Sequence, residues 1–353
     1  MKNLMFLSTE PYSGKTGLAI NLVKELRRRD RQAVYFKPVG NLPASIDSTI
    51  CDKDALYAKE VLGLETPVGE LCPLVLTSSE TLERLRGEGE GAVGRIKGAF
   101  AKVTASGSPV VIEGSGHIND GRLHHASAPE LIVDFDAGAV LVVKLDNTFE
   151  IVDDILVVRD RFGDSLVGVI FNWVRPAQRQ VLEDTVVPFL DREGIPSFGI
   201  MPRDASLLAV SVDTLARALG GRFLCGKEHS GDMVETCMVG AMGQEQALRF
   251  FRHKARKAVV TGGDRADVQL AALETPTSCL VLTGNYPPPP AVLSVAEQKG
   301  VPVMLVEVDT LTAVERTESL IGQTRVHDQA KLNEIGERMR EHLDMDRICA
   351  VLD

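Results

Sequence analysis

The chain lacks any stretch that is apolar over the roughly 20 residues that a membrane-spanning helix requires. It also lacks the charged and apolar regions of a signal peptide, because its first residues lead directly into the short apolar segment Leu4–Leu7. These two absences predict a cytoplasmic protein that does not contact a membrane.

Closely spaced cysteine pairs are absent as well. The sequence has no C-x-x-C pair, the spacing typical of zinc sites and redox centres. The six cysteines lie far apart: Cys51, Cys72, Cys225, Cys237, Cys279 and Cys349. Such a scattered set predicts buried, reduced thiols, and it argues against both a zinc site and a disulfide framework.

The sequence has no excess of basic residues. Lys and Arg number 39 against 49 Asp and Glu, so the net charge is −10. Because binding to nucleic acid requires clustered positive charge, this balance argues against a broad nucleic-acid surface. What is present is a chain of 353 residues, 44% of them hydrophobic, which is long enough for two domains with ordinary cores.

The amino-terminal stretch Ser8–Thr16 carries the strongest motif. It follows the apolar segment Leu4–Leu7 and opens into a helical pattern with Leu18, Leu22 and Leu26 on one face. An apolar strand, a glycine-containing loop and a helix in this order predict a phosphate-binding loop, in which Thr9 takes the place of the usual first glycine. The simpler alternative is a glycine turn that binds nothing.

In this interpretation the loop binds a polyphosphate together with Mg²⁺. Backbone amides of the loop and of the helix N-terminus point at the phosphates, Lys15 reaches the β- and γ-phosphates, and the Thr16 hydroxyl holds Mg²⁺. The residues assigned to the loop are Thr9, Ser13, Gly14, Lys15, Thr16 and Gly17.

Apolar strand segments alternate with helical patterns as far as Asp204 and predict an α/β domain, residues 1–208, with a doubly wound parallel sheet. Several of these segments end in polar residues, among them Lys37, Glu113 and Asn172. Ligands bind at the carboxyl ends of strands in such sheets. Lys37 is therefore either a lysine for phosphate or a substrate carboxylate, or a plain exposed lysine.

Acidic residues near these strand ends are candidate Mg²⁺ ligands. The aspartates of Cys51–Asp54 precede a helical pattern, so a helix cap and a metal ligand are equally supported roles. Glu113 follows an apolar strand and precedes two glycines, which suits a carboxylate that holds Mg²⁺ directly or through water. His117 either contacts a substrate or lies exposed after the turn.

The second half of the chain predicts a smaller α/β domain, residues 209–330, followed by a C-terminal helix and tail, residues 331–353. Its most distinctive segment is Thr261–Asp267, in which Gly263, Asp264 and Arg265 are candidates for a ligand site. A buried ion pair or a turn anchor is an equally good interpretation of the two charged residues.

Four segments together resemble dethiobiotin synthetase in order and approximate spacing: Thr9–Thr16, Lys37–Val39, Glu113–Gly116 and Val169–Asn172. That family's phosphate loop also begins with threonine. The segment Thr261–Asp267 looks like a DRTGG domain, and the pair of domains resembles the N-terminal region of long-form phosphotransacetylases.

The resemblance implies a role for each matched residue. Lys15 and Lys37 would act on phosphate or substrate, and Thr16, Asp54 and Glu113 would hold Mg²⁺. Asn172 would contact adenine, with Pro202 also at the nucleotide. The family departs from this chain at Tyr12, Gly40–Asn41 and His117, which lie around the diamine substrate there, so the resemblance does not imply the dethiobiotin reaction.

Three functions remain open at this stage. The first is a Mg-ATP-binding regulator whose second domain reads a nucleotide or a partner enzyme, with a homodimer expected from the resemblance. The second is an ATP-dependent ligase that activates a small acid for attack by an amine. The third, least favoured by the loop and Glu113, is a scaffold that binds nothing.

Overall fold

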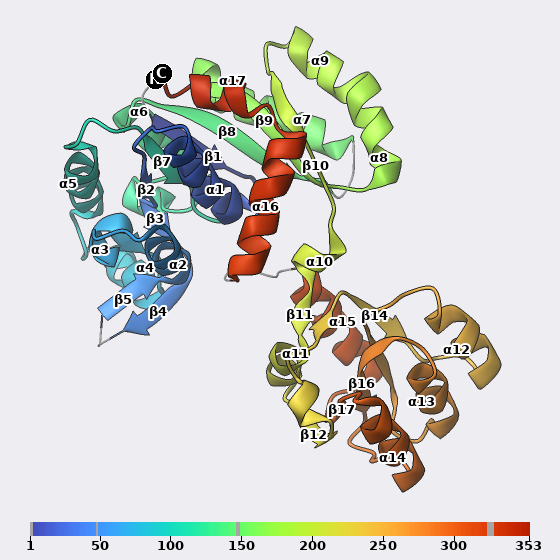
Figure 1. Ribbon diagram of the computed structural model, residues 1–353. Helices are drawn as coiled ribbons and strands as arrows, with labels where there is room; N and C mark the ends of the chain where they lie inside the picture. The colour runs from blue at the N-terminus through green and yellow to red at the C-terminus, as the bar shows by residue number, and fades with distance from the viewer. Residues whose placement is uncertain (1–2, 47–48, 146–148, 323–327) are drawn as a thin grey trace. The chain divides into compact units, whose positions relative to one another are not determined.

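The computed structural model describes residues 3–46, 49–145, 149–322 and 328–353. The chain forms two compact units (Figure 1), Met1–Arg203 with Arg325–Asp353, and Asp204–Thr324. The C-terminal helix and tail predicted over 331–353 contain α17 and most of α16, and these residues belong to the first unit. Among the described helices, none combines the length and the apolar character that a bilayer crossing requires.

The first unit is built on a six-stranded sheet with the order β10-β9-β8-β1-β7-β2. Every neighbouring pair of strands is parallel. The strands are β1 (Asn3–Leu7), β2 (Val34–Phe36), β7 (Val110–Glu113), β8 (Ala137–Lys144), β9 (Leu166–Val174) and β10 (Ser197–Pro202). Because the chain starts at β1 inside the sheet and adds strands on both sides, the sheet is doubly wound, as predicted.

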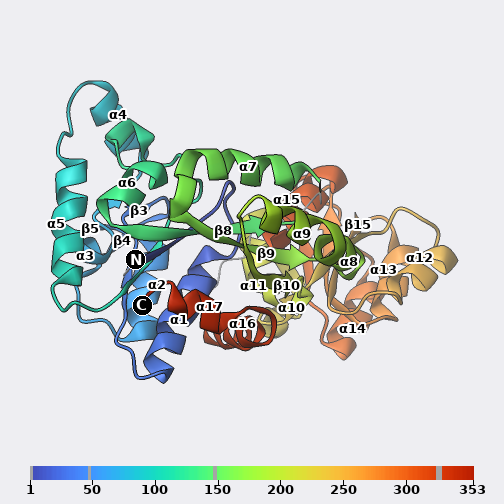
Figure 2. The same cartoon turned by 90° about the horizontal axis from the view of Figure 1, so that it is seen from above.

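Helices cover both faces of this sheet. In Figure 2, α7 lies on one face, and α1, α16 and α17 lie on the other. The helices are α1 (Lys15–Arg28), α2 (Lys53–Leu62), α3 (Val68–Leu71), α4 (Ser78–Leu85), α5 (Ala92–Thr104), α6 (Ala128–Asp134), α7 (Glu150–Phe162), α8 (Pro176–Val181), α9 (Val187–Arg192), α16 (Gln329–His342) and α17 (Met345–Ala350). Burial on both faces explains why the central strands are continuous apolar runs.

Local sequence accounts for several of these elements. The apolar stripe of α1 is buried, with Leu18, Leu22 and Leu26 no more than 1% exposed. Helices α4 and α5 are separated where Gly87, Gly89 and Gly91 adopt positive φ. A side chain rarely tolerates that backbone conformation, so the glycines end one helix before the next begins.

A small accessory layer connects β2 to α2. Strand β3 (Val39–Gly40) pairs parallel with β6 (Leu74–Val75). The hairpin of β4 (Pro43–Ile46) and β5 (Thr49–Asp52) is antiparallel and leads directly into α2. This path returns the chain from the carboxyl end of β2 to the same edge of the sheet, where α2 begins.

The second unit holds a five-stranded sheet with the order β12-β17-β16-β15-β14. All pairs are parallel except that of β12 with β17. The strands are β12 (Arg222–Cys225), β14 (Thr236–Val239), β15 (Lys257–Gly262), β16 (Thr277–Thr283) and β17 (Val303–Leu305), and a separate antiparallel pair joins β11 (Val210–Ser211) to β13 (Met233–Val234).

Six helices accompany this sheet within the described residues, and the unit has its own apolar core. The helices are α10 (Ala205–Leu208), α11 (Val212–Leu219), α12 (Gln244–Phe251), α13 (Ala266–Leu273), α14 (Pro290–Lys299) and α15 (Thr310–Gly322). Val259, Val268 and Leu280 at the centre of the core are fully buried. The predicted second α/β domain is thus present, and it begins at Asp204.

Candidate functional site

The loop between β1 and α1 leads into a helix whose N-terminus has no side-chain cap. Gly14 is the N-cap of α1 with φ 95°, no side chain caps the helix, and its first turn contains no acidic residue. The first amides of a helix have no partner within it and carry partial positive charge. The end of α1 that faces the loop therefore suits an anion.

Asn172 braces this loop from the carboxyl end of β9. Its Nδ2 donates to the backbone oxygen of Ser13 at 2.8 Å, and its Oδ1 accepts from the backbone nitrogen of Trp173 at 3.0 Å. The fit to Gly14 is tight, because a Cβ at Gly14 would lie 2.5 Å from Asn172 Nδ2. Asn172 thus shapes the loop, and its predicted contact with adenine stays a prediction.

Lys15 is folded into the loop and is only 6% exposed. Its ammonium donates to Ser8 Oγ, to Ser13 Oγ at 3.2 Å and to the backbone oxygen of Gly116 at 3.2 Å. Burial lowers the pKa of Lys15 to about 8, and the nearby Glu113 carboxylate opposes that shift. All three acceptors are uncharged, so an anion bound at the loop would supply the charge that this lysine needs.

Thr16, Glu113 and Lys37 form a continuous network beside the loop. The Thr16 hydroxyl donates to Glu113 Oε1 at 2.8 Å, and Lys37 Nζ donates to the same oxygen at 2.9 Å. Lys37 Nζ also donates to Asp54 Oδ2 at 2.8 Å and lies 3.3 Å from Asp52 Oδ1. The network joins the first turn of α1, the ends of β2 and β7, and the start of α2.

The charges in this network are buried. Lys37 and Glu113 are each 2% exposed, and Asp54 is 4% exposed. Burial alone would lower the pKa of Lys37, but Glu113, Asp54 and Asp52 together raise it well above its usual value. Lys37 is therefore a charged lysine held among carboxylates, and the alternative of an exposed strand-end lysine is wrong.

Asp52 takes one of the two roles that the sequence left open, that of the helix cap. Asp52 caps α2, since its Oδ1 accepts from the backbone nitrogens of Asp54 and Ala55, and its Oδ2 accepts from that of Leu42. A Cβ at Gly40 would clash with this carboxylate, so the glycine makes room for the cap. Asp54 instead faces Lys37.

Tyr35 is a member of the network that sequence reasoning missed. It is fully buried, and its hydroxyl donates to Glu113 Oε2 at 2.6 Å. Burial and the Glu113 charge raise the pKa of Tyr35 well above its usual value, so the hydroxyl keeps its proton. The only signal in the sequence is the alternation of side chains along an extended segment, which places Tyr35 on the same side as Lys37, the residue that follows β2.

The network suits a magnesium ion that also binds phosphate. In the described part of the chain, no three His, Cys, Asp or Glu side chains converge as a complete metal cage. Mg²⁺ does not need one, because it is commonly held by one or two carboxylates, a hydroxyl, waters and substrate phosphates. The Thr16 hydroxyl with Glu113 and Asp54 fits that donor set, and the position of the Lys37 ammonium shows that the carboxylates favour a cation.

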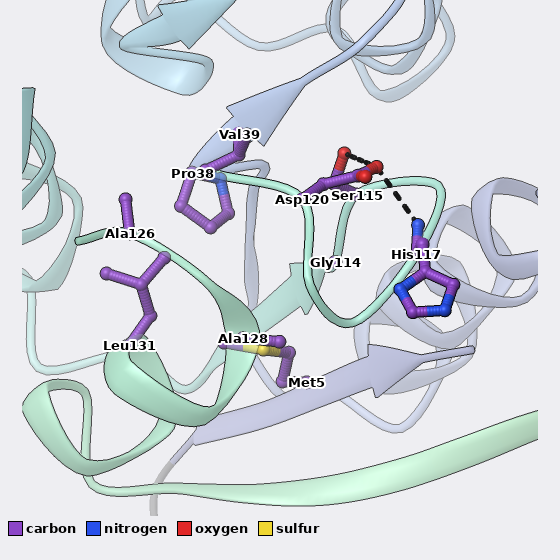
Figure 3. Close-up of a pocket in the computed structure, with 10 residues that line it drawn as sticks. All are labelled: Met5, Pro38, Val39, Gly114, Ser115, His117, Asp120, Ala126, Ala128 and Leu131. Carbon is purple, nitrogen blue, oxygen red and sulfur yellow. Dashed lines mark hydrogen bonds between the residues drawn. The ribbon is translucent and has the colours of Figure 1, made fainter. Parts of the chain in front are cut away.

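A small pocket lies next to this network (Figure 3). It is lined on one side by Pro38 and Val39, which follow Lys37, and on the other by the loop after β7. In that loop, Asp120 Oδ2 accepts from Ser115 Oγ at 2.8 Å and from the backbone nitrogen of His117 at 3.0 Å. Asp120, which sequence reasoning did not single out, thus orders the segment that contains His117.

The remaining predicted residues are placed as follows. Thr9 is half-buried in the loop, and Gly17 is buried in α1, where its carbonyl accepts from Asn21 Nδ2 at 2.9 Å. Pro202 ends β10 and pairs in register with Val174 of β9, so it lies at the same edge of the sheet as Asn172.

In the second unit, the predicted ligand residues form a turn. Arg265 donates to the Met242 carbonyl at 2.9 Å and pairs with Asp267 at 3.2 Å. A Cβ at Gly263 would clash with the backbone of Tyr286, so this glycine allows two loops to pack closely. The proposed buried ion pair between Asp264 and Arg265 is corrected: the partner is Asp267, and both partners are more than one-third exposed.

The doubly wound parallel sheet and the loop geometry define a P-loop NTPase fold in the first unit. The chain belongs to the AAA domain family, which it matches over residues 2–211. Residues 214–320 match the DRTGG domain. The predicted combination of a P-loop domain followed by a DRTGG domain is thereby confirmed.

The relatives that the chain matches are distant in sequence. The chain is 20% identical to "Phosphate acetyltransferase" from Synechocystis sp., an alignment that covers 100% of this chain and 52% of that protein. It is 26% identical to "Cobyric acid synthase" from Cutibacterium acnes, covering 81% of this chain and 62% of that protein. The chain thus spans about half the length of the phosphate acetyltransferases that it matches.

Among solved structures, the cell division protein MinD from Aquifex aeolicus is similar over 59% of this chain and 84% of its own. The two are 13% identical, with a TM-score of 0.36. At that score the assignment of the fold depends on the strand order and the family matches.

Proposed function

We propose that this chain is a Mg-ATP-binding regulatory protein, in which the first unit binds ATP and the DRTGG unit reads a nucleotide or a partner enzyme. One observation supports the first part above all others. The phosphate loop, through Thr16, belongs to the same hydrogen-bond network as Lys37, Asp54 and Glu113. This network brings buried carboxylates to a helix N-terminus, an arrangement that is expected of a loop that binds phosphate and a metal ion and not of a loop that binds nothing.

Each side chain has a defined task in this proposal. The N-terminus of α1 binds the phosphates, and Lys15 leaves its uncharged acceptors to neutralise them. Thr16, Glu113 and Asp54 would hold Mg²⁺, which neutralises charge on the phosphate oxygens when it is bound. Lys37, which lies between Asp54 and Glu113, then faces the terminal phosphate or a second substrate.

Regulation would follow from differential affinity. If ATP binds one state of the protein better than another, it shifts the population toward that state by the ratio of the two affinities. Similarity over the whole chain to proteins named phosphate acetyltransferase supports a role beside an acyl-transfer enzyme. A homodimer in the cytoplasm, as the sequence predicts, is part of this proposal.

An ATP-dependent ligase is the second candidate, and the pocket beside Lys37 favours it. Ser115, His117 and Asp120 line this small pocket, which has room for about one water molecule in the present structure and lies between Pro38–Val39 and the loop after β7. In such an enzyme Lys37 would stabilise charge while a small carboxylate takes up the terminal phosphate and an amine displaces it. The 26% identity to a cobyric acid synthase is in line with this candidate.

A thermal-shift experiment tests the proposal. Unfolding of the purified chain is measured with Mg²⁺ and, in turn, ATP, ADP, AMP, cyclic dinucleotides and acetyl phosphate, because a ligand of the native state raises the melting temperature. We expect Mg-ATP to stabilise the wild type and to leave Lys15→Ala unchanged. If neither protein responds to ATP, the proposal fails. Release of ADP that depends on a small acid or amine would select the ligase instead.

A further inference from the structure

Trp173 adopts a backbone conformation that is unusual for a bulky residue. It lies near the carboxyl end of β9 with φ 63°, in the left-handed region. Large side chains seldom occupy this region, and residues that do so cluster at ligand sites. In this conformation the backbone nitrogen of Trp173 donates to Asn172 Oδ1. The side-chain amide of the same asparagine donates, through Nδ2, to the backbone oxygen of Ser13 in the phosphate loop.

Lys144 lies over the indole ring of Trp173. Its ammonium lies 4.8 Å from the centroid of the Trp173 ring, which is the geometry of a cation–π contact. The two residues come from the carboxyl ends of neighbouring parallel strands, since Lys144 pairs with Asn172 in the register of β8 and β9. The Trp173 side chain is half-buried, so the ring is held in place and still reaches solvent.

The sheet determines on which side of the loop a nucleoside must lie. Strand β1, which leads into the phosphate loop, has β7 and β2 on one side and β8, β9 and β10 on the other. Glu113 and Lys37, which form the metal-side network, lie on the β7 and β2 side. If the terminal phosphate and its metal lie there, the other end of the nucleotide extends toward β8 and β9.

We propose that Trp173 is the base-stacking residue of the nucleotide site and sets its preference for a nucleoside triphosphate over bare polyphosphate. The inference rests on the proposed ATP site and adds the contact that binds the nucleobase. Every nucleobase has a π-face, and stacking on an aromatic side chain tolerates different bases. The site would therefore select for a base, with purines favoured by their larger stacking area.

The chain offers an unusually direct test, because Trp173 is its single tryptophan. With Mg²⁺ present, we expect ATP to change the tryptophan fluorescence of the wild-type protein, whereas tripolyphosphate binds at the same loop without changing it. Calorimetry gives the two dissociation constants independently. This experiment needs no variant, so it does not depend on whether a mutant folds.

Variants then measure the contribution of stacking. Trp173→Leu should weaken ATP binding by about tenfold and leave tripolyphosphate binding unchanged, and Trp173→Phe, which keeps an aromatic face, should restore most of the loss. Phe250→Leu, at an exposed aromatic residue of the second unit, is the matched control and should bind ATP normally.

The possible failures are distinguishable. If the wild type binds neither ATP nor tripolyphosphate, the proposed function itself is wrong. If ATP binds but the fluorescence does not change, or if Trp173→Leu weakens ATP and tripolyphosphate equally, then the base does not stack on Trp173. In that case the inference is overturned and the ATP site stands.

Discussion

The hydroxyl of Thr16 donates to Glu113 Oε1 at 2.8 Å and so connects the first turn of α1 to the end of β7. The two residues are far apart in the sequence, and each belongs to a different part of the expected Mg-ATP site. Because of this contact, a substitution of Glu113 also changes a hydrogen bond of the phosphate loop.

Glu113→Gln should remove most of the gain in ATP affinity that Mg²⁺ provides. The amide keeps the size of the side chain and can still accept from Thr16, but it no longer offers a negative charge to the ion. We expect the ratio of ATP dissociation constants without and with Mg²⁺ to fall by about tenfold or more, as measured by calorimetry. Glu183→Gln, an exposed substitution in the same unit, should retain the wild-type ratio. An unchanged ratio in Glu113→Gln would mean that this carboxylate does not serve the metal.

Tyr35→Phe should destabilise the first unit and weaken the Mg²⁺ effect. The change deletes one hydroxyl and leaves Glu113 Oε2 without its 2.6 Å donor. Because a hydrogen bond to a charged group contributes about 1.5–3 kcal/mol, we expect a loss of that order in the free energy of unfolding, measured by urea denaturation. ATP binding without Mg²⁺ should stay close to wild type. If stability falls and the Mg²⁺ effect is intact, Tyr35 is only a packing residue.

Gly14→Ala should destabilise the protein by more than the backbone strain that alanine experiences at a positive φ. Gly14 has φ 95°, and an added Cβ would lie 2.5 Å from Asn172 Nδ2. Gly107 has φ 71° with open space around its Cβ position, so Gly107→Ala carries the backbone strain without the collision. We expect Gly14→Ala to be the less stable of the two by about 1–3 kcal/mol in urea unfolding, and to lose ATP binding. Equal stabilities would mean that the loop moves away from Asn172 at no cost.

Lys15 should make the stability of the ligand-free protein depend on pH. Its pKa is about 8 in the folded chain against 10.5 ordinarily, because burial disfavours the charge. Between these values the unfolded chain binds more protons, so the contribution of Lys15 to the free energy of unfolding rises with pH through this window. Below pH 8 both states are protonated, and the folded state carries the full cost of the buried charge.

Lys15→Met should remove this cost. We expect the variant without ligand to be more stable than the wild type at pH 7 by about 1–3 kcal/mol, and the difference to shrink as the pH approaches 10.5. Urea unfolding of both proteins at several pH values measures this. Lys257, whose pKa burial also lowers to about 8, is present in both chains and cancels in the difference. A difference that is constant with pH would contradict the prediction.

Much of the first unit could be predicted from sequence because its signals are local. The strand, loop and helix around Gly14 follow from an apolar run, a glycine and a helical period, and the doubly wound sheet follows from alternating elements. The residues at strand ends meet because parallel strands share an edge. Lys37 and Glu113 were therefore singled out, and the structure places them 2.9 Å apart.

What could not be predicted depends on contacts between distant segments. The bond from Tyr35 to Glu113 requires the register of β2 on β7, and a lone tyrosine in an apolar strand gives no hint of it. The cap that Asp52 forms on α2 and the contact of Asp54 with Lys37 depend on the pairing of β4 with β5, which leads the chain into α2. Arg265 forms its ion pair with Asp267 because the turn after β15 brings together residues two positions apart.

The last helices of the chain complete the first unit. Asn21 in α1 donates to the carbonyl of Leu332 at 2.9 Å, and Gly336 allows α16 to approach that asparagine closely. During synthesis, the P-loop unit would thus wait, with one flank of α1 uncovered, until the whole DRTGG unit has been translated. A deletion of α16 and α17 would damage a unit whose sheet is translated before the DRTGG unit.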